Sequence, residues 1–165
     1  MTTRSLTIRD ARAEELAEVG LLTRSAYAAA WLGSERYLAH VQDAAARAAS
    51  ATLLVAEVDG RLVGTVTLAA AGTAYADIAR PGEYEFRMLA VDPTATGAGV
   101  GSALVEACEQ RAAAEGAARI VCSVEDKNAS ALRLYARLGY EREPARDWCP
   151  EDGVRLLVHG RDLPR

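Results

Sequence analysis

The sequence contains almost no lysine. Only Lys127 among its 19 basic residues is a lysine, and with 23 acidic residues the chain has a net charge of -4. A surface that binds nucleic acid needs an excess of basic side chains, so this balance argues against a nucleic-acid partner. The preference for arginine, together with abundant alanine and glycine, is typical of a bacterial genome rich in G and C.

Cysteine and histidine are also scarce. The chain has Cys108, Cys122, Cys149 and two isolated histidines, His40 and His159. No pair of these residues has metal-ligand spacing, and an odd number of cysteines is no basis for a disulfide framework. We therefore expect reduced thiols, no metal and a cytoplasmic protein.

Long hydrophobic runs are missing as well. No segment approaches the roughly 20 apolar residues of a membrane-spanning helix, and residues 1–8 lack the apolar core of a signal peptide. We therefore expect no membrane partner. Half of the 165 residues are hydrophobic and a quarter are charged, which is ordinary for a globular protein. The length favours one domain over residues 1–165.

Hydrophobic periodicity predicts a mixed α/β fold in the order β-α-α-β-β-β-α-β-α-β-β. The sequence Asp59-Gly60-Arg61 predicts a hairpin turn, and the Ala/Gly-rich residues 70–82 predict a loop. Strands are expected at 5–9, 52–58, 62–68, 84–91, 119–124, 140–143 and 154–159, and helices at 16–26, after Ser34, at 100–115 and at 128–138. The crossover through 100–115 predicts that strands 84–91 and 119–124 are parallel.

Three alternating glycines lie between the strand 84–91 and the following helix. The stretch is LAVDPTATGAGVGSAL, with glycine at positions 97, 99 and 101. Glycine allows positive φ and close approach of a ligand, and the first N–H groups of a helix lack internal partners. The junction therefore predicts an anion site built from main chain, although a purely structural turn remains an alternative. No lysine follows as in a P-loop, and the spacing is not that of a dinucleotide fold.

Two blocks of this sequence resemble the GCN5-related N-acetyltransferase (GNAT) family. TGAGVG at 96–101 matches the signature [Q/R]-x-x-G-x-[G/A], except that Thr96 replaces Gln or Arg, and Ala98 stands where a basic or amide residue is common. The second block matches N-x-x-A-x-x-x-Y-x-x-x-G-[FY] through Asn128, Ala131, Tyr135, Gly139 and Tyr140. The expected element order is similar to this family over nearly the whole chain.

The resemblance implies a GNAT-like acyl-CoA N-acyltransferase fold that takes acetyl-CoA as acetyl donor. In this family the glycine turn holds the pyrophosphate, and the strand before it binds the pantetheine arm through its backbone. The cofactor-binding residues implied here are Leu89, Ala90, Val91, Thr96, Gly97, Ala98, Gly99, Val100, Gly101, Ser102 and Asn128. Arg133 and Arg137 could reach the nucleotide phosphates or be ordinary solvated charges.

Acetyl transfer to an amine needs a base, because an alkyl amine with a pKa of about 10.4 is mostly protonated at neutral pH. The resemblance implies Glu85 as that base, eleven residues before Thr96. The alternative is a charged strand face on which Arg87 pairs with Glu85. Tyr135 is the implied acid that protonates the leaving thiolate, and its alternative is a packing role.

The acceptor is not specified by the sequence. Trp31, Tyr37, Tyr75 and Trp148 are candidates to line its pocket. A small-molecule amine or a peptide N-terminus remains open as acceptor, and a homodimer, frequent in the family, is compatible with the composition. The alternative functions are a catalytically silent acyl-CoA-binding module that senses its ligand and an interaction protein without a ligand.

Overall fold

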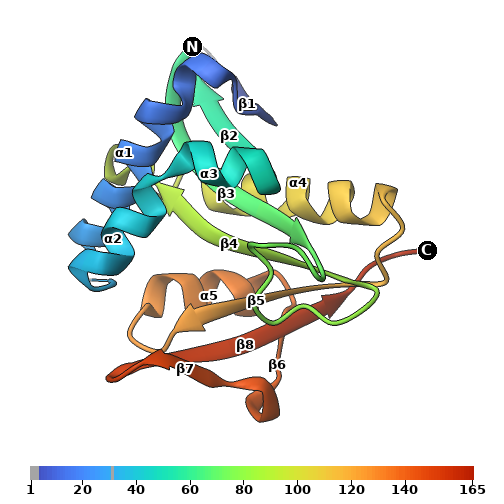
Figure 1. Ribbon diagram of the computed structural model, residues 1–165. Coiled ribbons are helices and arrows are strands. Elements are labelled where there is room, and N and C mark those ends of the chain that lie inside the picture. Colours follow the sequence, from blue (N-terminus) through green and yellow to red (C-terminus); the bar gives the residue numbers. More distant parts are fainter. Residues whose placement is uncertain (1–3, 31) are drawn as a thin grey trace.

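A single eight-stranded sheet organises the computed structural model, which describes residues 4–30 and 32–165 (Figure 1). Its strand order is β1-β2-β3-β4-β5-β8-β6, and β7 pairs with β8. The strands are β1 Leu6–Asp10, β2 Thr52–Val58, β3 Arg61–Ala70, β4 Glu83–Val91, β5 Arg119–Glu125, β6 Glu141–Arg142, β7 Trp148–Glu151 and β8 Val154–Asp162. The helices are α1 Leu16–Ala29, α2 Glu35–Gln42, α3 Ala44–Ser50, α4 Val100–Ala114 and α5 Ala129–Arg137.

The predicted hairpin between β2 and β3 is confirmed. Asp59 and Gly60 both have positive φ, 51° and 79°, and the strands on either side pair in antiparallel fashion from Val58 and Arg61 onward. Two consecutive left-handed residues give the turn whose twist matches that of a hairpin. The segment 71–82 also lies outside helices and strands, as expected for a loop.

The predicted parallel pair of β4 and β5 is short. The register runs only from Glu83 opposite Arg119 to Glu85 opposite Val121, at the start of both strands. Beyond this point the two strands separate toward their carboxyl ends, as the ribbon shows (Figure 1). The sheet is therefore open at the place where β4 runs into the glycine turn.

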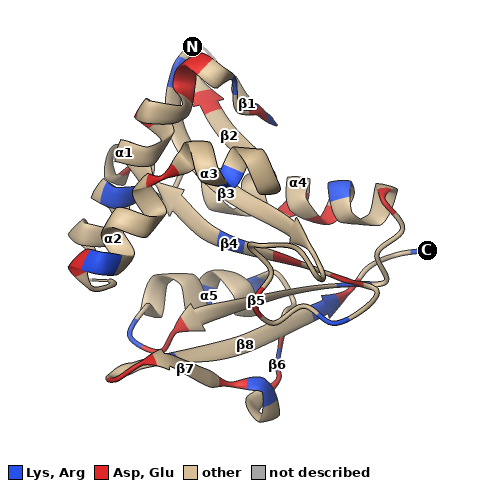
Figure 2. Ribbon diagram, in the orientation of Figure 1, with Lys and Arg blue, Asp and Glu red and all other residues tan. Residues whose placement is uncertain are grey.

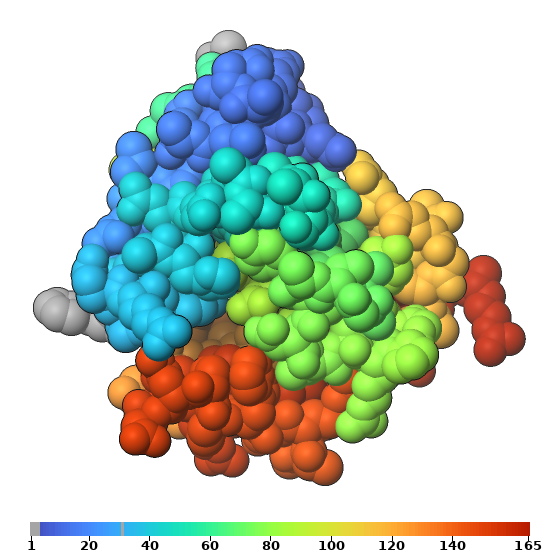
Figure 3. Space-filling model, in the orientation of Figure 1, coloured from blue at the N-terminus to red at the C-terminus, as the bar shows by residue number. Residues whose placement is uncertain are grey.

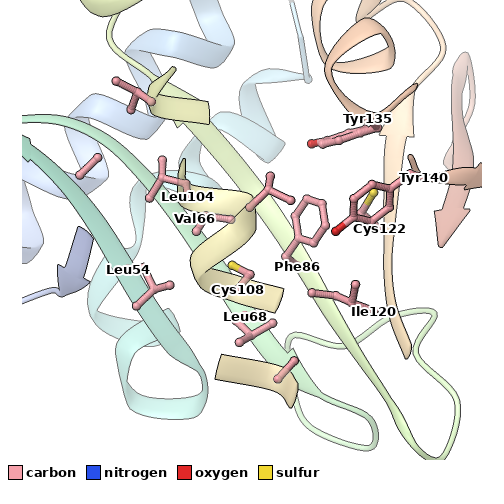
Figure 4. Packing of buried hydrophobic residues seen from close by; sticks show 14 of the residues in the cluster. Leu54, Val66, Leu68, Phe86, Leu104, Cys108, Ile120, Cys122, Tyr135 and Tyr140 are labelled. Carbon is pink, nitrogen blue, oxygen red and sulfur yellow. The ribbon is translucent and has the colours of Figure 1, made fainter. Parts of the chain in front are cut away.

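The helices cover both faces of the sheet. α4 and α5 pack on one face around a core that includes Leu104, Phe86 and Tyr135 (Figure 4). α1, α2 and α3 cover the other face through two smaller clusters. Cys108 and Cys122 are buried free thiols in the larger core, and Cys149 is an exposed one.

A β-bulge interrupts β4 just before the opening. The register against β3 shifts between Thr65 and Thr67, and Met88 has a φ of 56°. Regular alternation would place Phe86 and Met88 on the same face, but Phe86 packs toward α4 while Met88 packs in the cluster of Val41. The bulge disrupts the ladder and leaves the extra residue unpaired, so it re-aims the backbone at the end of β4.

Two elements were not predicted, α3 and β7. The sequence of α3, AAARAAS, has no apolar stripe, and the helix is defined by its cap, in which the Asp43 side chain accepts from the N–H of Ala46 at 3.0 Å. β7 has four residues, includes Pro150 and pairs irregularly with β8. The predicted strand 140–143 is shorter in the structure, and the predicted strand 154–159 extends to Asp162.

A fully buried arginine on α3 lies between the helices and the sheet. Arg47 is 0% exposed, and its guanidinium donates to the hydroxyls of Thr67 and Thr23 at 3.4 Å each and to the sulfur of Met88 at 3.3 Å. In the described part of the chain its Nε has no partner and no carboxylate forms a salt bridge with it. Burial lowers the pKa of Arg47, because the charged form is poorly solvated there.

We expect Arg47→Met to leave the free energy of unfolding unchanged or to raise it by up to about 2 kcal/mol. Methionine keeps the apolar stem and removes a buried charge that no carboxylate compensates. Urea denaturation of both proteins measures the difference. A loss of more than about 2 kcal/mol would mean that the bonds to Thr23 and Thr67 stabilise the fold more than the buried charge destabilises it.

Candidate active site

Two adjoining cavities occupy the opening between β4 and β5. The first, the sheet cavity, has a volume of about 450 Å³ and is bounded by the α1–α2 connection, β4, β5 and the β7–β8 hairpin. The second, the turn cavity, has a volume of about 750 Å³ and is bounded by the C-terminal end of α1, the end of β4, the glycine turn and α5. Both are lined by Tyr27, Leu32, Leu89, Asn128 and Ala131. A ligand in one cavity would therefore meet a ligand in the other along this common wall.

The glycine turn forms one side of the turn cavity. Gly97 and Gly99 have φ values of 83° and 77°, which glycine adopts without strain. A Cβ built at either position meets nothing within 4 Å, so both face open space. Ala103 donates its N–H to the carbonyl of Gly99, so the amides of residues 100–102 precede the first bond of the helix. These amides and the positive end of the helix dipole make an anion site.

The turn cavity gathers the residues expected to bind the donor, with one exception. Its wall includes Leu89, Ala90, Val91, Thr96, Gly97, Gly99, Val100, Gly101, Ser102 and Asn128. Ala98 is not part of the wall, and its N–H is directed to the carbonyl of Ala95 at 3.4 Å. Arg133 and Arg137 are exposed on α5 and also line this cavity. The structure thus brings these residues together around one cavity, and their role in binding acetyl-CoA stays a prediction.

Asn128 begins α5 at the border of both cavities. Its side-chain oxygen accepts from the N–H of Ala131 at 3.1 Å, which caps the helix. The cap fixes the first turn of α5 at the wall that both cavities share with Leu89.

Tyr135 lies on α5 with its ring in the core. It is 5% exposed, and its ring centroid lies 5.5 Å from that of Phe86 and 5.8 Å from that of Tyr140. The hydroxyl points away from Cys122 and Tyr140 (Figure 4), and the residue lines the sheet cavity. Burial raises the pKa of Tyr135 well above its usual range. A phenol is protonated at neutral pH even without this shift. The raised pKa makes Tyr135 a weaker acid, so it donates only to a strongly basic group such as a thiolate.

A catalytic base was expected at an open face of β4, but Glu85 is buried there. It is 1% exposed, and Oε1 accepts from the N–H groups of Ile78 at 2.7 Å and Ala79 at 3.0 Å. It lines neither cavity in the described chain. Burial raises the pKa of Glu85, and the loop amides and Arg87 oppose this rise in part. The role of Glu85 as base stays a prediction, and it would require a water path or movement of the loop.

The predicted charged face of β4 is present, but its ion pairs differ from the expected one. Arg87 pairs with Asp77 at 2.8 Å rather than with Glu85, and it also donates to the carbonyl of Tyr75. Glu83 pairs with Arg146 at 3.0 Å. The side chains of Glu83, Glu85 and Arg87 therefore hold the loop 71–82, or residues that contact this loop, against β4.

We expect Glu85→Gln to change how stability depends on pH. The raised pKa means that folded protein binds this proton more tightly than the unfolded chain, whose carboxyl titrates near about 4.3. The free energy of unfolding therefore falls as the pH rises from the pKa of Glu85 in the unfolded chain to its higher pKa in the folded protein. Glutamine can still accept from both amides but does not ionise, so the urea midpoint of the variant should rise relative to that of wild type as the pH increases above the pKa of the unfolded carboxyl. Parallel midpoint curves would contradict a raised pKa at this site.

The aromatic residues expected around an acceptor are partly in place. Tyr37 and Trp148 line the sheet cavity, whereas Tyr75 is buried behind it and stacks on His40 with centroids 5.9 Å apart. Trp31 lies outside the described residues. The mouth opens where α2, the 71–82 loop and the β7–β8 hairpin meet (Figure 3).

Tyr27, His40 and Glu125 also line the sheet cavity, and none of them was predicted from the sequence. Burial and the nearby charges of Arg87 and Arg47 lower the pKa of His40. Glu125 is the last residue of β5, whereas the predicted strand ended one residue earlier. Ligand sites lie at the carboxyl ends of parallel strands, and that rule was the available signal for Glu125.

Comparison with known proteins decides the family. Residues 16–140 match the family model described as Acetyltransferase (GNAT) family. The chain belongs to the GNAT family of acetyltransferases. The GNAT-like mixed α/β fold expected from the sequence is thereby confirmed, with α3 and β7 added to the predicted order.

Solved GNAT structures share this fold along the whole chain. A PaiA N-acetyltransferase from Thermoplasma acidophilum, solved in complex with coenzyme A, has a TM-score of 0.73 at 18% identity and covers 96% of this chain and 99% of its own. A GNAT acetyltransferase from Staphylococcus aureus Mu50 has a TM-score of 0.75 at 14% identity, covering 97% and 100%. YncA from Salmonella typhimurium, solved with its cofactor acetyl-CoA, has a TM-score of 0.67 at 19% identity, covering 98% and 95%.

Metal-binding clusters and membrane-spanning helices are both absent from the described part of this GNAT domain. Residues 4–30 and 32–165 contain no group of three or more His, Cys, Asp or Glu side chains that could hold a metal ion. Within the same residues, no helix has both the length and the apolar character needed to span a membrane.

Proposed function

We propose that this GNAT domain is a cytoplasmic N-acetyltransferase that moves an acetyl group from acetyl-CoA directly to a primary amine. The observation that supports this most is the common wall of the two cavities, at Leu89, Asn128 and Ala131. A donor in the turn cavity and an amine in the sheet cavity would meet there, which satisfies the requirement of direct transfer for closely placed reactants.

The turn cavity fits acetyl-CoA as the donor. The open glycines and the amides of residues 100–102 suit the pyrophosphate, and the exposed Arg133 and Arg137 lie on the opposite wall. The backbone of residues 89–91 borders the same cavity, where the amides of a pantetheine arm can pair as an added strand. The Thermoplasma and Salmonella proteins were solved with coenzyme A and acetyl-CoA, which supports this donor here.

Tyr135 is the proposed acid. Its hydroxyl is kept protonated by burial, and it lines the cavity where an amine and a thioester would meet. Protonation of the departing thiolate is a step that such a group can supply. The bulge at Met88 presents main chain at the end of β4, and backbone N–H groups there are suited to stabilise the oxyanion. Glu85 remains the base candidate from the sequence.

A silent acyl-CoA-binding module is the alternative, since Thr96 and Ala98 depart from the family signature. Calorimetry with acetyl-CoA and a thiol assay for released CoA, run with a panel of small amines and peptides, separate the two. The enzyme is supported by binding together with amine-dependent CoA release and an acetylated product. Binding without release for every acceptor would favour the silent module, and the absence of binding would contradict both. Light scattering on the same sample would test the expected homodimer.

A further inference from the structure

We propose that the acceptor is a primary amine carried on an aromatic or apolar body, and that Glu125 receives its ammonium group and takes up its proton. This inference rests on the proposed function. It adds the class of acceptor and a second candidate for the base.

The sheet cavity is suited to an apolar body. Its wall includes the apolar side chains of Leu32, Tyr37, Phe86, Met88, Trp148 and Leu156, which come from five different elements or connections. A volume of about 450 Å³ is within the range of small-molecule sites. Removing an aromatic ring from water into such a wall is favourable by about 25 cal/mol per Å² of buried apolar surface.

Glu125 supplies the negative charge at the inner edge of this cavity. It is half-buried at the carboxyl end of β5, three residues before Asn128 on the common wall. β5 alternates, and Ile120, Cys122 and Val124 face the α4–α5 core, so Glu125 faces the other side. Acidic residues at the end of β5 and on the β7–β8 hairpin lie close together (Figure 2).

The other charged groups around this cavity leave Glu125 as the carboxylate available to an amine. Asp77 is occupied by Arg87, while Glu151 and Arg36 are exposed at the mouth. Among the described residues, no Lys or Arg side chain forms an ion pair with Glu125 within 4 Å. Burial raises the pKa of Glu125, with Asp126 and Glu151 adding to the rise and Lys127 and the Gly33 N–H opposing it. A carboxylate in this state is a better proton acceptor than an exposed one.

The proton balance of the reaction accommodates this role. Of the three protons on the ammonium nitrogen, one passes to Glu125 and then to solvent, and the nitrogen forms its bond to the carbonyl carbon. The carbon–sulfur bond breaks, and the Tyr135 hydroxyl gives its proton to the sulfur. The second nitrogen proton restores the Tyr135 hydroxyl, and the third stays on the amide.

Binding of 2-phenylethylamine and of its neutral analogue 2-phenylethanol tests the proposal. Calorimetry is run in the presence of CoA, which prevents turnover, with wild type, Glu125→Gln and the control Glu151→Gln at the mouth of the same cavity. We expect wild type to bind the amine at least about tenfold more tightly than the alcohol. Glu125→Gln should remove this difference and leave the affinities for the alcohol and for CoA unchanged. Glu151→Gln should keep the preference for the amine and weaken it by no more than about threefold, because Glu151 acts only through the field around Glu125.

The pH dependence of kcat/KM with 2-phenylethylamine then tests the proton transfer. Wild type should lose activity as pH falls through the pKa of Glu125, and Glu125→Gln should lose this acid limb while Glu85→Gln keeps it. If only Glu85→Gln loses the acid limb of the pH profile, Glu85 is the base and the proposal is overturned. Equal binding of amine and alcohol by wild type would overturn it without any variant. If other amines are acetylated while 2-phenylethylamine is not bound, this inference fails and the proposed function stands.

Discussion

Gly99→Asp should weaken acetyl-CoA binding by at least about a hundredfold. The new carboxylate would lie at the N-terminus of α4, where the amides of residues 100–102 are proposed to hold the pyrophosphate. Negative charge there opposes a phosphate directly and also occupies the same N–H groups. Aspartate is among the few residues that tolerate the left-handed conformation of Gly99, and its Cβ meets nothing within 4 Å, so the variant should fold. Calorimetry with acetyl-CoA measures the loss.

Gly72→Asp is the matched control for this substitution. Gly72 has a φ of 81°, a Cβ built there also meets nothing within 4 Å, and the residue lines neither cavity in the described chain. The control introduces the same strain and the same charge away from the turn. It should bind acetyl-CoA as wild type does. Similar losses in both variants, or no loss in Gly99→Asp, would mean that the pyrophosphate is not held at this turn.

Tyr135→Phe should lower kcat by about 100- to 10,000-fold, the usual range for a general acid. The KM for acetyl-CoA should change by no more than about threefold, because the proton is needed in the transition state rather than for binding. Phenylalanine preserves the ring contacts with Phe86 and Tyr140, so the core should remain intact. Steady-state kinetics with any amine found to be a substrate measures both constants.

Tyr140→Phe separates this effect from a general loss of packing. Tyr140 belongs to the same aromatic cluster, but its hydroxyl donates to Glu109 at 2.8 Å and it lines neither cavity. Its removal should cost about 1–2 kcal/mol of stability and leave kcat unchanged. If Tyr135→Phe turns over as fast as wild type, Tyr135 is a packing residue. Equal losses of kcat in both variants would point to the same conclusion.

Local chemistry explains which parts of the fold could be predicted. The hairpin at Asp59-Gly60, the turn at Gly97 and Gly99 and the helix start at Asn128 each depend on residues adjacent in sequence, and each lies in the structure where the sequence indicates. The parallel pairing of β4 with β5 followed from the crossover rule. The small helix α3 has only the Asp43 cap and no apolar stripe, and β7 includes a proline and pairs irregularly, so the hydrophobic pattern predicts neither element.

The site could be predicted on the donor side better than on the acceptor side. Most of the predicted residues of the turn cavity lie in one contiguous stretch and at one helix start, and a motif can capture both, although the end of α1 also lines this cavity. The sheet cavity is assembled from α1, α2, β4, β5 and the β7–β8 hairpin, so Tyr27, His40 and Glu125 come together only in three dimensions. The burial of Glu85 could not be predicted from the sequence either, because it depends on a loop that folds back and donates two N–H groups to the carboxylate.

A crystal structure of the protein with CoA bound would show directly whether the two cavities hold donor and acceptor as proposed. We expect the pyrophosphate at the amides of residues 100–102 and the pantetheine arm along residues 89–91. We also expect the sulfur at the common wall of the two cavities, within hydrogen-bonding reach of the Tyr135 hydroxyl. A pyrophosphate bound away from the glycine turn, or a sulfur that does not reach the wall formed by Leu89, Asn128 and Ala131, would contradict the proposal.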